Sequence, residues 1–138
     1  MKSEKHIINS EYSAVTDLIN RLREQHMYSH LADRVKGEIE ICLVEALNNV
    51  VRHSFKEVSG NSIEVYVTLS DSEIEIKIVE DGIPRPPMNK PTLDFDPEDI
   101  DNIPEGGMGL YIIDQLMTET EYTSENNVNT FLMKKKLT

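Results

Sequence analysis

The sequence lacks the features of a membrane-spanning, secreted or nucleic-acid-binding protein. None of its apolar runs approaches the roughly 20 residues that cross a bilayer, and its first residues do not read as a signal peptide. Lys and Arg number only 14 against 25 Asp and Glu, and the net charge of −11 disfavours direct binding to nucleic acid or an anionic membrane. Cys42 is the single cysteine, so we expect no intramolecular disulfide, a buried thiol and a cytoplasmic protein.

The composition nevertheless supports a substantial core. Of the 138 residues, 38% are hydrophobic and 28% are charged, which predicts a single globular domain over residues 1–138. An anionic ligand is compatible with the negative net charge only where backbone N–H groups, a helix terminus or a bound cation create a local positive field.

Hydrophobic spacing predicts an α+β protein. Helical periodicity is found at 10–27, with Ser10 as a possible N-cap, and the 3.6-residue pattern returns at 31–55 and 108–117. Strands are predicted at 5–8, 62–69, 72–79, 120–124 and 129–136. This order favours a two-layer sandwich with helices packed on one face of a mainly antiparallel sheet.

One long segment fits neither pattern. All six prolines lie between Pro84 and Pro104, in a stretch that is also acidic. A loop of this length in a small protein is usually functional. The acidic run at 94–98 lacks the glycine and the terminal glutamate of an EF-hand, so we do not interpret it as a calcium site.

The predicted helix around residues 39–51 carries polar side chains inside an apolar run. Glu45 and Asn49 are four residues apart and share one side of the helix, with His53 one turn further. A carboxylate can accept the proton of a nucleophile, and an amide oxygen can bind Mg²⁺ beside phosphates. A purely structural pair is equally compatible with this pattern, and His53 is more typical of a structural residue.

Two further segments carry possible chemistry. Three of the four residues at positions 106–109 are glycine, directly before the third predicted helix, and backbone N–H groups there can cradle an anion. A flexible hinge is the alternative. Glu80, Asp81 and Gly82 end a predicted strand, where a carboxylate can accept a hydrogen bond from a base amino group; a simple acidic turn is the alternative.

Taken in order, these segments resemble the GHKL (Bergerat-fold) ATPases, and the short chain is most similar to the anti-sigma factor serine kinases of the RsbW type. The resemblance runs from about residue 10 to the C-terminus and rests chiefly on residues 44–53 and 106–117. It implies Glu45 as the general base and Asn49 as the ligand of Mg²⁺, and it makes residues 84–105 the ATP lid. The other nucleotide-binding positions that it implies are Glu80, Asp81, Gly82, Gly107, Met108, Gly109, Leu110 and Thr130.

The adenine-contacting segment departs from the family pattern, which reads Asp, any residue, Gly. Aligning Gly82 makes Glu80 the adenine reader, whereas choosing Asp81 places Ile83 at the glycine position. Both assignments remain open from the sequence. Ser54 stands where the family commonly has Gly or Ala, and we expect little effect from it.

The resemblance implies an ATP- and Mg²⁺-dependent serine kinase that phosphorylates an anti-anti-sigma (STAS) partner, sequesters a sigma factor and forms a homodimer. One alternative is a switch kinase of a stress-signalling relay that does not bind a sigma factor. Another is a nucleotide-sensing or sequestering module that has lost its kinase activity.

Overall fold

The computed structural model describes residues 2–85 and 107–137, which form a five-stranded sheet covered by helices. The strands are β1 (Lys2–Asn9), β2 (Ser62–Leu69), β3 (Glu73–Glu80), β4 (Glu119–Glu125) and β5 (Val128–Lys136). Their order in the sheet is β1-β2-β3-β5-β4, and every neighbouring pair is antiparallel.

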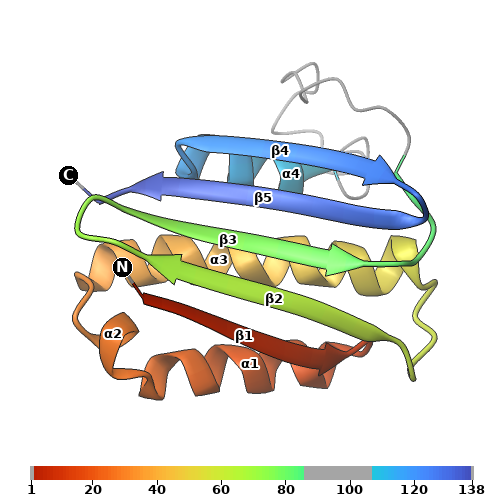
Figure 1. The fold of residues 1–138 in the computed structure, drawn as a ribbon, viewed down its shortest axis with the longest axis horizontal. Coiled ribbons are helices and arrows are strands. Elements are labelled where there is room, and N and C mark those ends of the chain that lie inside the picture. Colours follow the sequence, from red (N-terminus) through yellow and green to blue (C-terminus); the bar gives the residue numbers. More distant parts are fainter. Residues whose placement is uncertain (1, 86–106, 138) are drawn as a thin grey trace, which may run out of the picture.

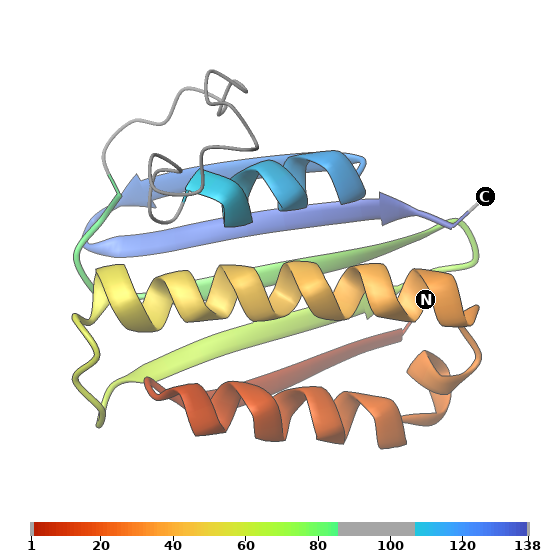
Figure 2. The ribbon, with the colours of Figure 1, turned by 180° about the vertical axis from the view of Figure 1, so that it is seen from behind.

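The helices lie on one face of this sheet. They are α1 (Tyr12–Glu24), the short α2 (His26–Ser29), α3 (Asp33–Asn49), which continues as a π-helix η1 (Val50–Ser54), and α4 (Gly107–Leu116). Figure 1 looks onto the open face of the sheet, and Figure 2, seen from the opposite side, shows α1, α3 and α4 side by side in front of it. The predicted α+β two-layer sandwich is therefore confirmed.

Alternation along the strands explains why one face is covered. Ile74, Ile76 and Ile78 are buried beneath the helices, and each is about 1% exposed, while Lys77 between them is exposed. Apolar residues of α3 complete the core from the other side. Cys42 is buried, as predicted, and this burial raises the pKa of its thiol to about 12.

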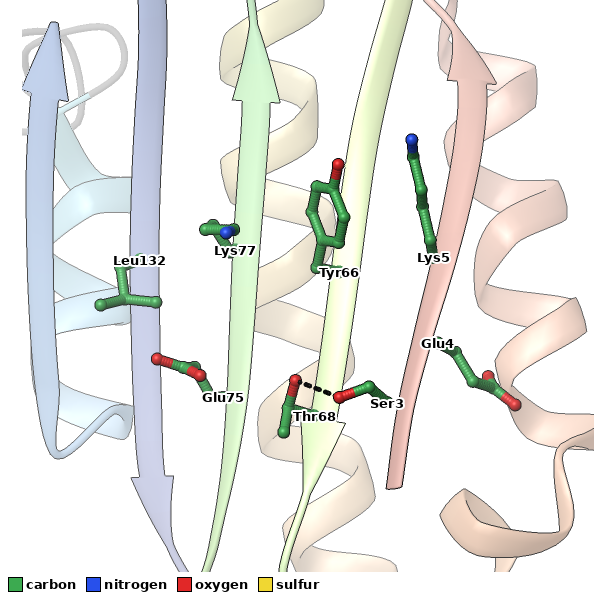
Figure 3. Close-up of a pocket in the computed structure, with 8 residues that line it drawn as sticks. All are labelled: Ser3, Glu4, Lys5, Tyr66, Thr68, Glu75, Lys77 and Leu132. Carbon is green, nitrogen blue, oxygen red and sulfur yellow. Dashed lines mark hydrogen bonds between the residues drawn. The ribbon is translucent and has the colours of Figure 1, made fainter. Parts of the chain in front are cut away.

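The open face carries charged and aromatic side chains in rows across the strands. Figure 3 shows Lys5, Tyr66 and Lys77 side by side on β1, β2 and β3, and both ammonium groups approach the Tyr66 ring, at 5.5 and 4.8 Å from its centroid. This row lies on the face that the helices leave uncovered.

Several boundaries differ from the sequence prediction. The first predicted helix ends at Glu24, and a separate short helix follows. The N-cap of α1 is Glu11 and not Ser10. The Ser10 hydroxyl instead donates to the carbonyl of Val58 at 2.7 Å. The prediction was wrong because the backbone N–H of Ser10 bonds to the carbonyl of Asn61, which fixes Ser10 on the loop leading into β2.

Candidate functional site

Glu45 faces the first turn of α4. A Cβ atom built on Gly109 would lie only 2.5 Å from Oε2 of Glu45, so the backbone of α4 approaches the carboxylate as closely as glycine permits. The helix α4 packs against α3 in the helical layer (Figure 2). The structure thus brings together two segments that the sequence analysis singled out separately, some sixty residues apart in the chain.

The side chains of Glu45 and Asn49 form no hydrogen bond or ion pair within the part of the chain that the structure describes. No fully buried polar side-chain atom there lacks a partner, so the polar atoms of this pair keep some access to solvent. Glu45 is half-buried, and Asn49, one turn later, is only 5% exposed. Polar side chains in largely buried places normally form a hydrogen bond within the protein or with water. An adjacent carboxylate and amide without partners are typical of a ligand site. His53, by contrast, is exposed.

The π-helix η1 carries the chain from this pair to a second cluster. Its wider turn is marked by the Phe55 N–H, which bonds back to the carbonyl of Val50 at 3.1 Å. Single π-turns within α-helices are frequently found at functional sites. The turn leaves Ser54 buried and directs its side chain and its carbonyl toward the end of β3.

Gly82 packs directly on the backbone of Ser54. The Ile83 N–H donates to the Ser54 carbonyl at 2.9 Å, and a Cβ on Gly82 would lie 2.5 Å from that same oxygen. Any side chain at this position would therefore force the end of β3 away from η1. The glycine predicted from the strand-end motif is required here by close backbone contact.

Glu80 is buried, and its carboxylate is the centre of a hydrogen-bond cluster. Oε1 accepts from the Gly82 N–H and from Nδ2 of Asn129, each at 2.8 Å, and Oε2 accepts from Oγ of Ser54 at 2.8 Å. Glu80 is 6% exposed, whereas Asp81 is exposed to solvent. Of the two candidate base readers, Glu80 is the one that points into the layer between sheet and helices.

The last hairpin contributes Asn129 rather than Thr130. Along β5, Asn129 is buried on the helix-covered side together with Phe131, while Thr130 alternates to the open face of the sheet. Thr130 thus lies on the face opposite Glu80, and its implied role at the nucleotide stays a prediction. Strand parity is the reason, since a one-residue shift places a side chain on the opposite face.

Arg85 is the last residue of the first described segment and lies near the hydrogen-bond cluster around Glu80. Its guanidinium carbon lies 5.0 Å from the centroids of both the Tyr122 and the Phe131 rings, and its backbone N–H donates to the Tyr122 hydroxyl at 2.9 Å. Burial lowers the pKa of Arg85. Sequence reasoning missed this residue, because both of its aromatic partners come from the distant final hairpin.

The glycine segment is described only in part. Gly107 and Met108 open α4, and Leu110 lies half-buried in its first turn. Glu105, Gly106 and the predicted ATP lid beyond Arg85 lie outside the described residues. The first turn of α4 is described, and in it Gly109 lies against Glu45.

Comparison with known proteins gives a family match over most of the chain. Residues 8–135 match the model of the histidine kinase-like ATPase domain. The sequence is similar to proteins named serine-protein kinase RsbW, at 28% identity over 101 residues in Bacillus thuringiensis and 29% over 103 residues in Bacillus mycoides. Each match covers 70% of this chain and 62% of the relative, so the match spans less than two thirds of the length of these relatives.

Solved structures show the same fold. The RsbU and RsbW domains of a Mycobacterium tuberculosis protein superpose with a TM-score of 0.68 at 15% identity, covering 99% of this chain and 33% of that one. The histidine kinase domain of a blue-light activated kinase from Erythrobacter litoralis gives 0.56 at 16% identity, covering 91% and 60%. At such identities the likeness concerns the fold alone.

Proposed function

The chain belongs to the family of histidine kinase-like ATPase domains, and from this premise we propose that it is a protein serine kinase that also acts as an anti-sigma factor. It transfers the γ-phosphoryl group of Mg-ATP to a serine of an anti-anti-sigma (STAS-domain) partner, and it sequesters a sigma factor. The similarity to serine-protein kinases named RsbW supports this choice among the activities of the family.

The observation that carries the proposal is the unpartnered pair on α3. Glu45 lies beside the start of α4 without an ion pair or hydrogen bond in the described chain, and so it is free to accept one from a ligand. Phosphoryl transfer requires a residue that orients the attacking hydroxyl and takes its proton. In this proposal Glu45 does both for the substrate serine.

Asn49 fits the role of a magnesium ligand. The Asn49 side chain is 5% exposed and forms no hydrogen bond within the described residues, and amide oxygens are suitable ligands for this hard cation. The described residues contain no group of three or more His, Cys, Asp or Glu that could hold a metal. Magnesium bound through one or two protein ligands plus nucleotide phosphates matches such a sparse site. The ion supplies neutralisation of phosphate charge when bound.

The phosphates are bound by backbone rather than by a lysine. The first N–H groups of a helix are unpaired and carry a partial positive charge. Gly107, Met108, Gly109 and Leu110 provide such groups at the start of α4, next to Glu45. This arrangement is compatible with a chain of net charge −11, because it concentrates positive potential at one point.

The base lies at the other end of η1 in this proposal. Glu80 accepts a hydrogen bond from the amino group of adenine, and Gly82 lets the backbone pass close to the adenine ring. Asp81 remains at the solvent side of the site. We further propose that the protein is a cytoplasmic homodimer. Separately, none of the helices in residues 2–85 and 107–137 is long and apolar enough to cross a membrane.

Glu45→Gln tests the catalytic assignment, with Glu40→Gln as matched control on the same helix. Glu40 is paired with Arg23 and lies away from α4. With labelled Mg-ATP and purified STAS partner, Glu45→Gln should lose at least about a hundredfold in transfer rate while binding a nonhydrolysable ATP analogue as tightly as wild type. Glu40→Gln should retain transfer.

Three results would count against the proposal. Absence of ATP binding removes its basis altogether. Binding without transfer by the wild type supports a nucleotide-sensing module instead, and undiminished transfer in Glu45→Gln removes Glu45 as the base. Co-purification with sigma factors then separates an anti-sigma kinase from a switch kinase that binds only its substrate.

A further inference from the structure

We infer that Ser54 and Asn129 are positioning residues that set the nucleobase selectivity of the site, by leaving the Glu80 carboxylate a single open acceptor position. This inference rests on the proposed nucleotide binding and goes beyond it, because it assigns the choice of base to two side chains that do not themselves have to touch the nucleotide.

The Glu80 carboxylate has few acceptor positions left for a ligand. A carboxylate offers about four acceptor positions, two on each oxygen. Among the described residues, three are occupied: both positions of Oε1, by Gly82 and Asn129, and one position of Oε2, by Ser54. One position of Oε2 is left for a ligand.

The donors to Glu80 are themselves fixed. The Asn129 amide uses all of its groups: Nδ2 donates to Glu80 and, at 2.9 Å, to the Gly82 carbonyl, while Oδ1 accepts from the Ser124 hydroxyl at 2.7 Å. Both Asn129 and Ser54 are buried, at 1% and 4% exposure. The carboxylate is therefore held in one orientation, and the extra methylene of Glu relative to Asp adds no freedom.

The single open acceptor distinguishes adenine from guanine. Adenine presents one amino donor at position 6, which matches a single open acceptor. Guanine presents a carbonyl oxygen at position 6, which cannot donate to a carboxylate. A carboxylate can accept from both the N1–H and the N2–H of guanine only when each of its oxygens has a free lone pair. Asn129 and Gly82 fill Oε1, so this bidentate contact is blocked. A site that rejects a ligand by leaving polar groups unpaired discriminates strongly.

The two side chains consequently have different effects when removed. Asn129→Ala frees a position on Oε1, which opens bidentate contact with guanine. Ser54→Ala frees the second position of Oε2 but removes the hydroxyl that fixes this oxygen, so adenine loses an oriented partner while guanine gains none. The contrast between the variants distinguishes positioning from a general loss of structure.

The experiment is calorimetric titration of wild type, Ser54→Ala and Asn129→Ala with ATP, GTP and purine riboside triphosphate, which lacks the 6-amino group, all with Mg²⁺. Ser62→Ala, at the exposed start of β2, is the control for hydroxyl removal. Wild type and Ser62→Ala should prefer ATP to both analogues. Asn129→Ala should lower the ATP-to-GTP affinity ratio about ten- to a hundredfold, the range for one hydrogen bond to a charged group.

Ser54→Ala should weaken ATP by about tenfold or more and leave purine riboside triphosphate unchanged. Because it removes only a hydroxyl, it is the variant that tests the inference if Asn129→Ala does not fold. ATP binding with selectivity unaltered in the folded variants would overturn the inference and leave the proposed function intact. No nucleotide binding by wild type would overturn both.

Discussion

The contact between Gly109 and Glu45 leads to a prediction that separates stability from activity. In Gly109→Ala the new methyl group meets Oε2 of Glu45 at 2.5 Å, whereas in Gly37→Ala, on α3, nothing lies within 4 Å of the new methyl group. Both positions are helical glycines with no positive φ. The two substitutions therefore differ mainly in whether the Glu45 side chain, the proposed general base, has to move.

The expected magnitudes follow from helix propensity. Replacing a helical glycine by alanine stabilises a helix by about 0.5–1 kcal/mol, which is our expectation for Gly37→Ala. At Gly109 the end of a flexible side chain has to rotate away, which offsets this gain and leaves the free energy of unfolding within about 1 kcal/mol of wild type. Displacing a reacting group by about 1 Å costs on the order of a hundredfold in rate, so transfer activity should fall by about that factor.

Urea unfolding and phosphoryl transfer measure the two effects on the same protein. A further variant checks the geometry without any assumption about function: in a Glu45→Ala background, Gly109→Ala should stabilise as Gly37→Ala does, because the obstructing oxygen is gone. That makes a coupling free energy of about 0.5–1 kcal/mol between the two positions. Additive effects, or full activity in Gly109→Ala, would refute the reasoning.

Two other predictions concern stability. Gly82→Ala should lower the free energy of unfolding by about 1–3 kcal/mol, measured by urea titration, because the methyl group meets the backbone carbonyl of Ser54, which cannot rotate away; an unchanged midpoint would contradict this contact. The Lys135 ammonium, hydrogen-bonded to Glu38 at 2.6 Å, holds the pKa of the Glu38 carboxyl below its usual 4.5. The ion pair therefore stabilises the fold fully above pH 4.5, and this stabilisation is lost as the pH falls through the lowered pKa of Glu38. The difference in thermal midpoint between wild type and Glu38→Gln, corresponding to about 1 kcal/mol or less, should be constant from pH 5 to 7 and shrink below pH 4.5; a difference that persists at pH 3 would exclude this origin.

Much of the fold could be predicted because its signals are local. The alternation of Ile74, Ile76 and Ile78 sets the buried face of β3, and the Val15, Leu18, Ile19 and Leu22 spacing sets that of α1. The cap at Ser10 could not be predicted, because Ser serves equally well as an N-cap or as a partner for a distant loop, and contact with residues 58–61 decided between them.

The sequence shows which residue types could form a site, but not which neighbours the fold gives them. The chemistry of Glu45 and Glu80 is visible in the sequence, since acidic side chains in apolar surroundings are conspicuous. The partners of Glu80 are not. A π-turn differs from an α-turn by one residue and has no compositional signature, so the inward position of Ser54 follows only from the structure. Strand parity similarly decided between Asn129 and Thr130, because both are small polar residues suited to the site.

Because α3 continues into η1 without a break, this helix fixes the distance between the two ends of the site. Glu45 and Ser54 are nine residues apart on one unbroken helical segment, which at helical rise corresponds to roughly 13 Å. The proposed chemical end and the proposed base end are thereby separated by a fixed length that no side-chain rotation can alter. A ligand long enough to span this distance can contact Glu80 and Glu45 together, whereas a shorter ligand can contact only one of them. Deleting one residue between Val50 and His53 would convert the π-turn into an ordinary helical turn. The distance between the two ends of the site would then change while Glu45, Ser54 and Glu80 all remain.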